Sequence, residues 1–228
     1  MNIIEISGLK KDYQLGSTVV PALRGVDLAV GEAELMSITG PSGSGKTTLL
    51  NVIGCIDPAT SGSVKVGGRE ITALTDRQIT DIRLHKIGFI FQTFNLIPVL
   101  DVLENVEFPL LLMKSSAAEA RKRAEKLVEE VGLTEYAAHR PAELSGGQRQ
   151  RVAIARALVT APDLVLADEP TANLDSVTGA SILELMRRMN EIEKTTFIFS
   201  THDANVLKYA RRIVKIKDGL IDNGGAAA

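Results

Sequence analysis

The sequence of 228 residues contains one cysteine and no tryptophan, and aromatic residues make up only 4% of it. The single cysteine, Cys55, excludes an internal disulfide and fits a reducing compartment. Its neighbours Val52, Ile53 and Ile56 are apolar. A buried packing role is therefore expected for this thiol rather than a reactive one.

Long hydrophobic runs and an excess of basic residues are also missing. The longest apolar runs, such as 108–113, are far shorter than the roughly 20 residues of a membrane-spanning helix. The first five residues lack the basic stretch before an apolar one that is typical of a signal peptide. The net charge is −2, so nothing favours nucleic acid as a ligand. We expect a soluble cytoplasmic protein without direct membrane insertion or a nucleic-acid partner.

The sequence does contain enough apolar residues for a large core, with 45% hydrophobic and 24% charged residues. Strands are predicted near 4–6 and 26–30 and over 35–39, 63–66, 69–71, 87–91, 164–167, 196–200 and 213–216, and helices over 49–53, 76–86, 152–158, 177–193 and 203–210. Gly67-Gly68 is typical of a hairpin turn. Apolar strands that alternate with helices predict a parallel sheet covered on both faces.

Residues 93–160 have a different character, because strand signals vanish there. A helix over 116–131 interleaves Glu with Lys and Arg, which is typical of a solvated face. We predict one domain over 1–222: an α/β core from 1–92 and 161–222 that includes an N-terminal antiparallel β subdomain, and an inserted α-helical subdomain over 93–160. Residues 223–228 are predicted to be a flexible tail.

The run from Gly40 to Thr47 matches the phosphate-binding pattern G-x-x-x-x-G-K-[ST] completely, between a predicted strand and an apolar helix. Its glycines let backbone amides wrap phosphates at a helix N-terminus. Lys46 would reach the β- and γ-phosphates, the Thr47 hydroxyl would bind Mg²⁺, and Thr48 could add a hydroxyl to the α-phosphate. The predicted nucleotide-binding residues of this loop are Gly40, Ser42, Gly43, Ser44, Gly45, Lys46, Thr47 and Thr48.

A second motif is the pair Asp168-Glu169, at the end of the predicted buried strand 164–167. Two adjacent acids at the carboxyl end of a strand are costly unless a cation or substrate uses them. Asp168 suits the coordination of Mg²⁺, directly or through water. Glu169 suits the general base that deprotonates the attacking water.

The third motif is Leu144-Ser145-Gly146-Gly147-Gln148, ahead of a predicted helix. Ser145 can cap that helix, while Gly146 and Gly147 let its first amides approach an anion. One chain therefore carries two phosphate-binding helix starts. That is too many for one nucleotide, unless two copies of the chain share it.

With these three motifs, residues 3–221 resemble the ABC ATPases, which have a P-loop NTPase (RecA-like) core. The resemblance implies an ATPase with ATP and Mg²⁺, working as a homodimer in which Ser145, Gly146, Gly147 and Gln148 close over the partner's ATP. It also implies that Gln92 contacts Mg²⁺ and the attacking water, that His202 bonds the γ-phosphate, and that Tyr13, after the first strand, stacks on adenine. Lys46, Gln92, Glu169 and His202 are then the catalytic set. Asn173-Leu174-Asp175 matches the family's D-loop, but Asn173 is larger than usual there and is assigned no contact.

Within that family, residues 90–98 and 103–110 and the run His139-Arg140-Pro141 resemble the lipoprotein-release (LolD-like) and macrolide-export (MacB-like) ATPases. This implies a subunit that drives separate integral membrane permease subunits from the inner face of the cell membrane, or else an excised ATPase domain, because MacB-like chains carry the permease behind the ATPase. A cell-division regulator of the FtsE type, or another non-transport ABC ATPase, remains the alternative. The sequence lacks sustained heptads, so it does not predict the long coiled coil of repair ATPases. The Leu144–Gln148 run opposes a P-loop kinase or switch GTPase.

The apolar loop after Gln92 includes Phe94, Leu96 and Leu100. We expect about half of its apolar residues to pack inside. The others are expected to line a groove for a short helix of the membrane subunit.

Overall fold

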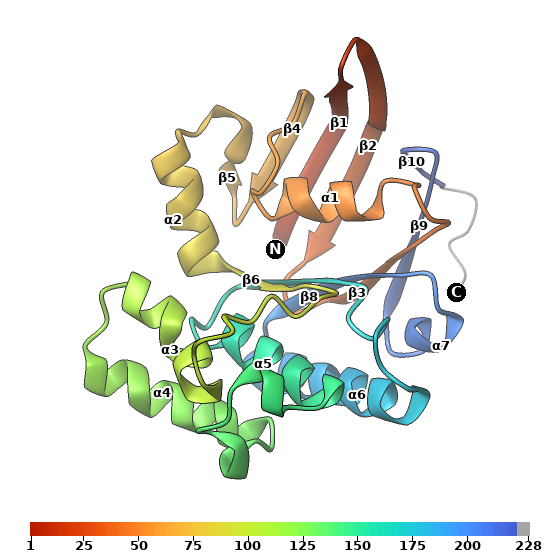
Figure 1. Ribbon diagram of the computed structural model, residues 1–228. Helices are drawn as coiled ribbons and strands as arrows, with labels where there is room; N and C mark the ends of the chain where they lie inside the picture. Colours follow the sequence, from red (N-terminus) through yellow and green to blue (C-terminus); the bar gives the residue numbers. More distant parts are fainter. Residues whose placement is uncertain (223–228) are drawn as a thin grey trace.

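An antiparallel sheet forms the N-terminal part of the protein (Figure 1). The computed structural model describes residues 1–222 (of Ala204, only the backbone), so the predicted tail lies outside the described residues. Strands β1 (Asn2–Leu15) and β2 (Thr18–Gly31) pair as a long hairpin, and β4 (Ser61–Val66) and β5 (Arg69–Glu70) complete the order β2-β1-β4-β5. Gly67 and Gly68 turn the last hairpin with φ of 56° and 75°, which glycine adopts readily.

A six-stranded sheet forms the centre, in the order β10-β9-β3-β8-β7-β6. Its members are β3 (Leu35–Thr39), β6 (Ile87–Ile90), β7 (Leu164–Asp168), β8 (Thr196–Thr201), β9 (Arg212–Lys217) and β10 (Leu220–Ile221). The pairs within β9-β3-β8-β7-β6 are parallel, and only β10 runs antiparallel to its neighbour. The predicted mainly parallel sheet is therefore confirmed.

Both faces of the sheet are covered along β3, β6 and β7, which explains why these strands are mainly apolar, whereas β9 has exposed lysine and arginine residues. On β7, Leu164 and Leu166 pack into one buried cluster, while Val165 and Ala167 pack into the other. Because successive side chains of a strand point to opposite faces, the two clusters lie on opposite sides of the sheet. In Figure 1 the first side carries α1 (Lys46–Ile53) and the antiparallel sheet, and the second carries α5 (Gly146–Leu158) and α6 (Ser176–Glu193).

Helices occupy the stretch between β6 and β7, where no strand is described. They are α3 (Val102–Leu112), α4 (Ala117–Glu130) and α5, with short 3-10 turns between the last two. Asp101 starts α3 with a capping box, and Pro109 lies inside this helix. Helix α2 (Asp76–Lys86) precedes β6. No helix within residues 1–222 is long and apolar enough to cross a bilayer. The division into core and inserted subdomain stays a prediction.

Several predicted segments end or begin elsewhere. The strand predicted over 69–71 stops at Glu70, because Ile71 opens a 3-10 turn whose Thr72 amide is capped by the Glu70 side chain. Helix α7 (Ala204–Leu207) is shorter than the predicted 203–210, since the amides of Tyr209 and Ala210 bond to carbonyls three residues back rather than four. Tyr13 lies within β1 and not after it.

Candidate functional site

The glycine-rich turn between β3 and α1 has a backbone that only glycine tolerates at three positions. A Cβ at Gly40 would lie 2.1 Å from the carbonyl oxygen of Ile216. Gly43 and Gly45 have φ of +76° and +105°, and Gly45 is the N-cap of α1. The turn therefore leads directly into a helix start, whose free amides and dipole favour an anion.

Lys46, the first residue of α1, is buried and only 7% exposed. Its Nζ donates to the carbonyl oxygens of Gly40 at 2.8 Å and Pro41 at 3.0 Å, and within residues 1–222 no carboxylate forms an ion pair with it. The buried hydroxyl of Ser44 has no hydrogen-bond partner among the described residues. A buried cation without a counter-charge is costly, so this loop fits a bound phosphate.

The carboxylate of Asp168 lies across from this loop, at the end of β7. Thr47 Oγ1 donates to its two oxygens at 3.1 and 3.0 Å, and the hydroxyl of Ser200 donates to its Oδ1. Hydroxyl and carboxylate oxygens are hard ligands that suit Mg²⁺. Residues 1–222 contain no group of three or more His, Cys, Asp or Glu side chains placed to hold a metal. The pair Thr47 and Asp168 therefore fits an ion that takes its other ligands from phosphate and water.

Glu169 has an unusual backbone, with φ of +48° in the left-handed region. Its amide donates to the carbonyl and hydroxyl oxygens of Ser200, both at 3.2 Å, which holds this conformation. Its Oε1 lies 2.8 Å from Nδ1 of His202, which is mostly exposed, whereas Glu169 is largely buried. The geometry aims the carboxylate and the imidazole at one another beside the glycine-rich turn.

A cleft of about 600 Å³ brings most of the predicted residues together. Its lining residues are Ala22, Pro41, Ser42, Gly43, Gly45, Lys46, Thr47, Thr48, Gln92, Glu169 and His202. Gln92 directly follows the end of β6, where the chain leaves the sheet. Residues from five separate segments thus face one space, at the carboxyl ends of the parallel strands, where open α/β sheets bind ligands.

Tyr13 does not line this cleft. Its hydroxyl donates to Asp57 at 2.7 Å, and the Lys11 ammonium lies 4.9 Å from the centre of its ring. Burial and the Asp57 carboxylate raise the pKa of the Tyr13 hydroxyl, although the Thr48 hydroxyl opposes this. Contact with Thr48 places Tyr13 beside the start of α1. Stacking on adenine therefore stays a prediction.

The run 145–148 also lies outside the cleft, at the start of α5. Ser145 caps this helix: its Oγ accepts from the Gln148 amide at 3.3 Å, and Gln148 Oε1 accepts from the Ser145 amide at 2.8 Å. A Cβ at Gly147 would lie 2.5 Å from Thr178 Cγ2. The capped helix start predicted from the sequence is present, but a single chain does not bring it to the cleft.

Two residues at the site were not predicted. Ser200 holds both Asp168 and the Glu169 backbone, and Asn173 donates its side-chain amide to the Gln92 carbonyl oxygen at 2.8 Å. Asn173, to which the motif assigned no contact, thus bonds to the backbone of Gln92 within one chain. Ser200 could have been predicted, because it is a hydroxyl residue near the end of the strand that lies beside Asp168 and Glu169. Nothing local indicated the partner of Asn173, which lies 81 residues away.

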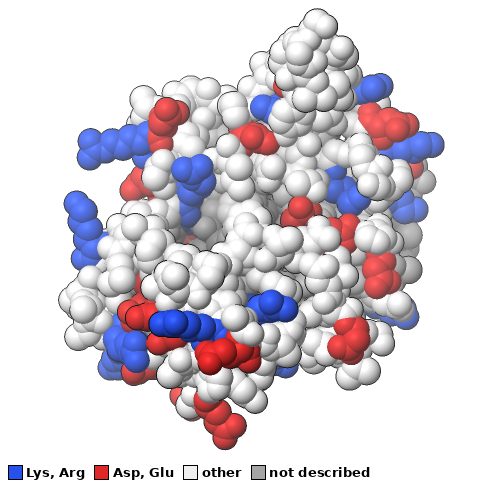
Figure 2. Space-filling view, viewed as in Figure 1, with Lys and Arg blue, Asp and Glu red and all other residues white. Residues whose placement is uncertain are grey.

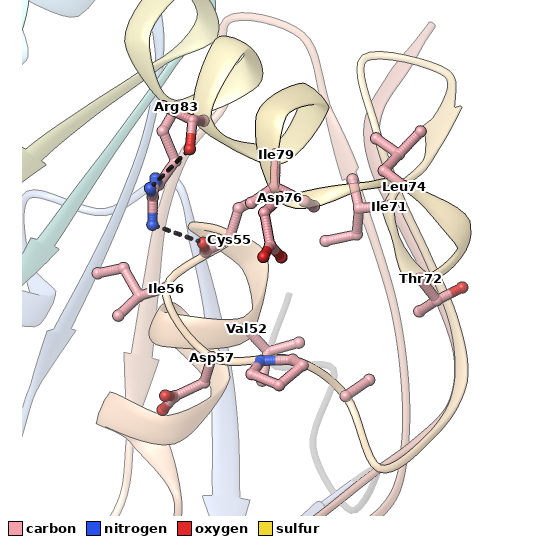
Figure 3. A pocket seen from close by; sticks show the side chains of 13 residues that line it. Val52, Cys55, Ile56, Asp57, Ile71, Thr72, Leu74, Asp76, Ile79 and Arg83 are labelled. Carbon is pink, nitrogen blue, oxygen red and sulfur yellow. Dashed lines mark hydrogen bonds between the residues drawn. The ribbon is translucent and has the colours of Figure 1, made fainter.

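A second cavity, of about 340 Å³, lies between α1, α2 and the loop that follows α1 (Figure 3). Arg83 crosses its wall and donates to the Cys55 carbonyl at 3.2 Å and to the Thr80 hydroxyl at 3.2 Å. Cys55 itself is buried, as predicted, and burial raises the pKa of its thiol to about 11. None of the predicted site residues lines this cavity.

Charges of both signs are interspersed on the face of the molecule seen in Figure 2. Neither sign covers a broad area of that face, so it exerts no strong long-range field of one sign.

Comparison with known proteins bears directly on these residues. The family described as "ABC transporter" matches residues 23–172, which include the glycine-rich turn, Gln92, the run 145–148 and Glu169. Tyr13 and His202 lie outside the matched stretch.

Curated relatives are nearly half identical to this chain over the stretch that aligns. An "Uncharacterized ABC transporter ATP-binding protein" of Thermotoga maritima is 48% identical over 220 residues, with 96% of this chain and 94% of that protein covered. A "Macrolide export ATP-binding/permease protein MacB" of Syntrophobacter fumaroxidans is 46% identical over 224 residues, with 97% of this chain covered. The chain spans only 31% of that MacB protein.

Solved structures agree in fold. The ATP-binding cassette MJ0796 of Methanocaldococcus jannaschii, in a dimeric post-hydrolysis state bound to ADP and Pi, is 46% identical, with a TM-score of 0.89 over 96% of this chain and 97% of that one. CbiO1 of Clostridium perfringens is 29% identical, with a TM-score of 0.86 over 97% of this chain and 87% of that one. The predicted fold class is confirmed. The chain therefore belongs to the ABC transporter family and is one of its ATP-binding, ATP-hydrolysing cassettes.

Proposed function

We propose that the chain is the ATPase subunit of a transporter, in which two copies close over ATP and drive integral membrane permease subunits. The observation that carries this is the split between the cleft and the run 145–148. The cleft gathers the glycine-rich turn, Gln92, Glu169 and His202, whereas the capped start of α5 lies apart from it. A second copy could bring its own helix start to the open side of the cleft. The dimeric state reported for MJ0796 supports this arrangement.

ATP binding would rest on the turn between β3 and α1. The amides at the start of α1 would hold the β- and γ-phosphates, and Lys46 would exchange its two carbonyl contacts for phosphate oxygens. Because Lys46 is already buried, the ion pair would form in a site with little water. Its electrostatic effect on the transferred phosphoryl group is therefore large.

The Thr47 hydroxyl and the Asp168 carboxylate would hold Mg²⁺, with Gln92 nearby. Bound there, the ion neutralises charge on the β- and γ-phosphate oxygens. The protein holds the two side chains that would bind the ion close together before the ion binds. Thr47 and Asp168 are already within hydrogen-bond distance of one another, and Ser200 restrains the carboxylate from behind.

Hydrolysis needs a base and a group that orients the reaction. Glu169 would accept the proton of the attacking water, and His202 Nδ1 holds one of its carboxylate oxygens at 2.8 Å. The other carboxylate oxygen would then accept the proton of the water. The left-handed backbone of Glu169 and its two bonds to Ser200 fix the direction in which this side chain leaves β7.

The permease would dock beside Gln92. A cleft of about 280 Å³ lies between α2, β6 and α3, and its walls include Leu84, Phe91, Asn95 and Pro109. Phe94, Leu96 and Leu100, expected to line such a groove, are half-buried and do not line this cleft, and Leu96 packs against the buried cluster. Most of its wall comes instead from α2, β6 and α5. A short permease helix in this groove would hold the cassette on the inner face of the membrane. The MacB relative, a "Macrolide export ATP-binding/permease protein", supports export as the process, and lipoprotein release rests on the resemblance of residues 90–98 and 103–110 alone.

The deciding experiment uses Glu169→Gln, which keeps the shape of the side chain and removes the base. We expect its kcat to fall about 10²- to 10⁴-fold, because general-base catalysis typically contributes that much. We also expect it to form a stable dimer with ATP and Mg²⁺, measured by light scattering, and to remain largely monomeric with ADP.

The control is Glu184→Gln, which changes an exposed glutamate paired with Arg187 on α6. It should hydrolyse ATP like the wild type and accumulate no stable dimer. A Glu169→Gln protein that stays monomeric with saturating ATP at high protein concentration would contradict the shared site.

A further inference from the structure

The loop 92–95 leaves β6 at the rim of the cleft, and side chains from two distant elements hold it. Arg156 of α5 donates through its two terminal nitrogens to the carbonyl oxygens of Phe94 and Asn95. Asn173 donates to the carbonyl oxygen of Gln92 at 2.8 Å. Phe94 and Asn95 have φ of 63° and 49°, a left-handed conformation that phenylalanine rarely adopts. The loop therefore depends on outside contacts for its shape.

Arg156 holds the loop 92–95 from helix α5. Burial lowers the pKa of its guanidinium, and both of its loop contacts are with neutral carbonyl groups. Arg149, two turns earlier on α5, lies over the Phe94 ring with 5.2 Å between guanidinium and ring centre. Both arginines come from the helix that begins with the run 145–148.

Asn173 is the second residue that holds the loop 92–95, and it belongs to the segment that follows Glu169. That segment is itself tied to α5, since the fully buried Gln150 donates to the Pro170 carbonyl at 2.7 Å. A Cβ at Gly146 would lie 3.3 Å from Leu174 Cδ2. The helix α5, the segment 170–174 and the loop 92–95 therefore form a closed ring of contacts. The bond from Asn173 to Gln92 is the step of this ring that holds a residue of the loop 92–95 lining the cleft.

We propose that Asn173 is a positioning residue for Gln92. Its amide fixes the peptide group that follows the Gln92 Cα, and Arg156 fixes the next turn, so together they set the direction in which the Gln92 side chain enters the cleft. The inference rests on the proposed function, in which Gln92 acts near the metal and the attacking water. Asn173 touches neither, and it acts only through Gln92.

The test is Asn173→Ala, with Asn173→Asp as a second variant that keeps the shape and places a carboxylate against the Gln92 carbonyl. Asn173 is exposed, so neither change should lower the unfolding midpoint appreciably. We expect kcat to fall about fivefold for Asn173→Ala, the rate equivalent of the roughly 1 kcal/mol of one hydrogen bond, and further for Asn173→Asp. KM for ATP should stay within about twofold, because the contacts of the glycine-rich turn are untouched.

Two further measurements separate positioning from a general structural role. In a Gln92→Ala background, Asn173→Ala should change kcat by less than about twofold, since its target is gone. Hydrogen exchange should speed up in a peptide covering 91–96, whose Phe94 amide bonds to the Phe91 carbonyl at 3.1 Å. Asn2→Ala is the matched control: it removes an exposed asparagine on β1 whose amide bonds to Glu5.

The outcomes are distinct. A wild-type kcat in Asn173→Ala, an equal loss of kcat with and without Gln92, a rise in KM alone, or unchanged exchange over 91–96 would each overturn the positioning role. A wild-type chain that does not hydrolyse ATP would instead overturn the proposed function.

Discussion

Ser200 links the two carboxylates of the site, and its replacement by alanine tests how that site is held. The residue is fully buried on β8, beside the end of β7. Its hydroxyl donates to Asp168 Oδ1 and accepts from the Glu169 amide at 3.2 Å. Alanine removes both contacts and leaves the backbone unchanged. We expect Ser200→Ala to lower both stability and turnover.

The size of the effect follows from what each partner retains. A hydrogen bond to a charged group is worth about 1.5–3 kcal/mol. The Glu169 amide keeps the Ser200 carbonyl at 3.2 Å, and Asp168 keeps its bonds from Thr47, so neither group is left without a partner. We therefore expect a loss of about 2 kcal/mol in the free energy of unfolding. For a chain of this size that corresponds to a fall of roughly 4–8 °C in the unfolding midpoint.

Turnover should fall as well, because Asp168 and Glu169 lose the same anchor. About 1.4 kcal/mol of lost transition-state stabilisation would lower kcat tenfold. The assays are thermal unfolding without nucleotide and the rate of phosphate release at saturating ATP and Mg²⁺.

The matched control is Ser37→Ala on the neighbouring strand β3. Ser37 is also fully buried, but its hydroxyl has no hydrogen-bond partner among the described residues. Removing an unpaired buried hydroxyl should leave the midpoint unchanged or raise it slightly. If Ser200→Ala lost no more stability and activity than Ser37→Ala, the two contacts of Ser200 would not hold the site, and the reasoning would be refuted.

Two more predictions concern single groups. Lys46→Ala should abolish ATP hydrolysis and greatly weaken nucleotide binding in a fluorescence titration, because it removes the ammonium that faces the phosphates; hydrolysis within about tenfold of the wild type would contradict this. Glu70 has its pKa lowered from 4.5 to about 2: burial raises it, but hydrogen bonds from the hydroxyls of Ser63 and Thr72 and the amides of Val64 and Thr72 lower it by more. Because the folded-state pKa is the lower one, its stabilisation is present above about pH 4.5 and is lost as the pH falls towards 2. Thermal unfolding should therefore show Glu70→Gln less stable than the wild type at pH 7, with a difference that shrinks below pH 4.5; a constant difference would contradict the assignment.

Much of the fold could be predicted because its signals are local. The strands over 35–39 and 164–167 are buried and mainly apolar, since both faces of the central sheet are covered there. The glycines of the run 40–47 are required by local backbone conformation and close contact. Helix α3 had no such signal, because Pro109 lies inside it and its apolar residues obscure the period. Tyr13 was predicted to follow the first strand because only the apolar residues near 4–6 indicated that strand. The observed strand β1 continues to Leu15 and therefore includes Tyr13.

The site differs from the fold in that its details depend on contacts between distant segments. The left-handed backbone of Glu169 needs Ser200, and the loop after Gln92 needs Arg156 and Asn173, which lie 31, 62 and 81 residues away along the chain. A motif identifies a side chain that can do the chemistry, but it does not identify the groups that aim it. In this protein those groups are a serine, an arginine and an asparagine that contact backbone or carboxylate rather than the cleft. Substitutions at these three positions should therefore change the rate of hydrolysis more than the affinity for ATP, and this is where the structure adds to what the motifs predict.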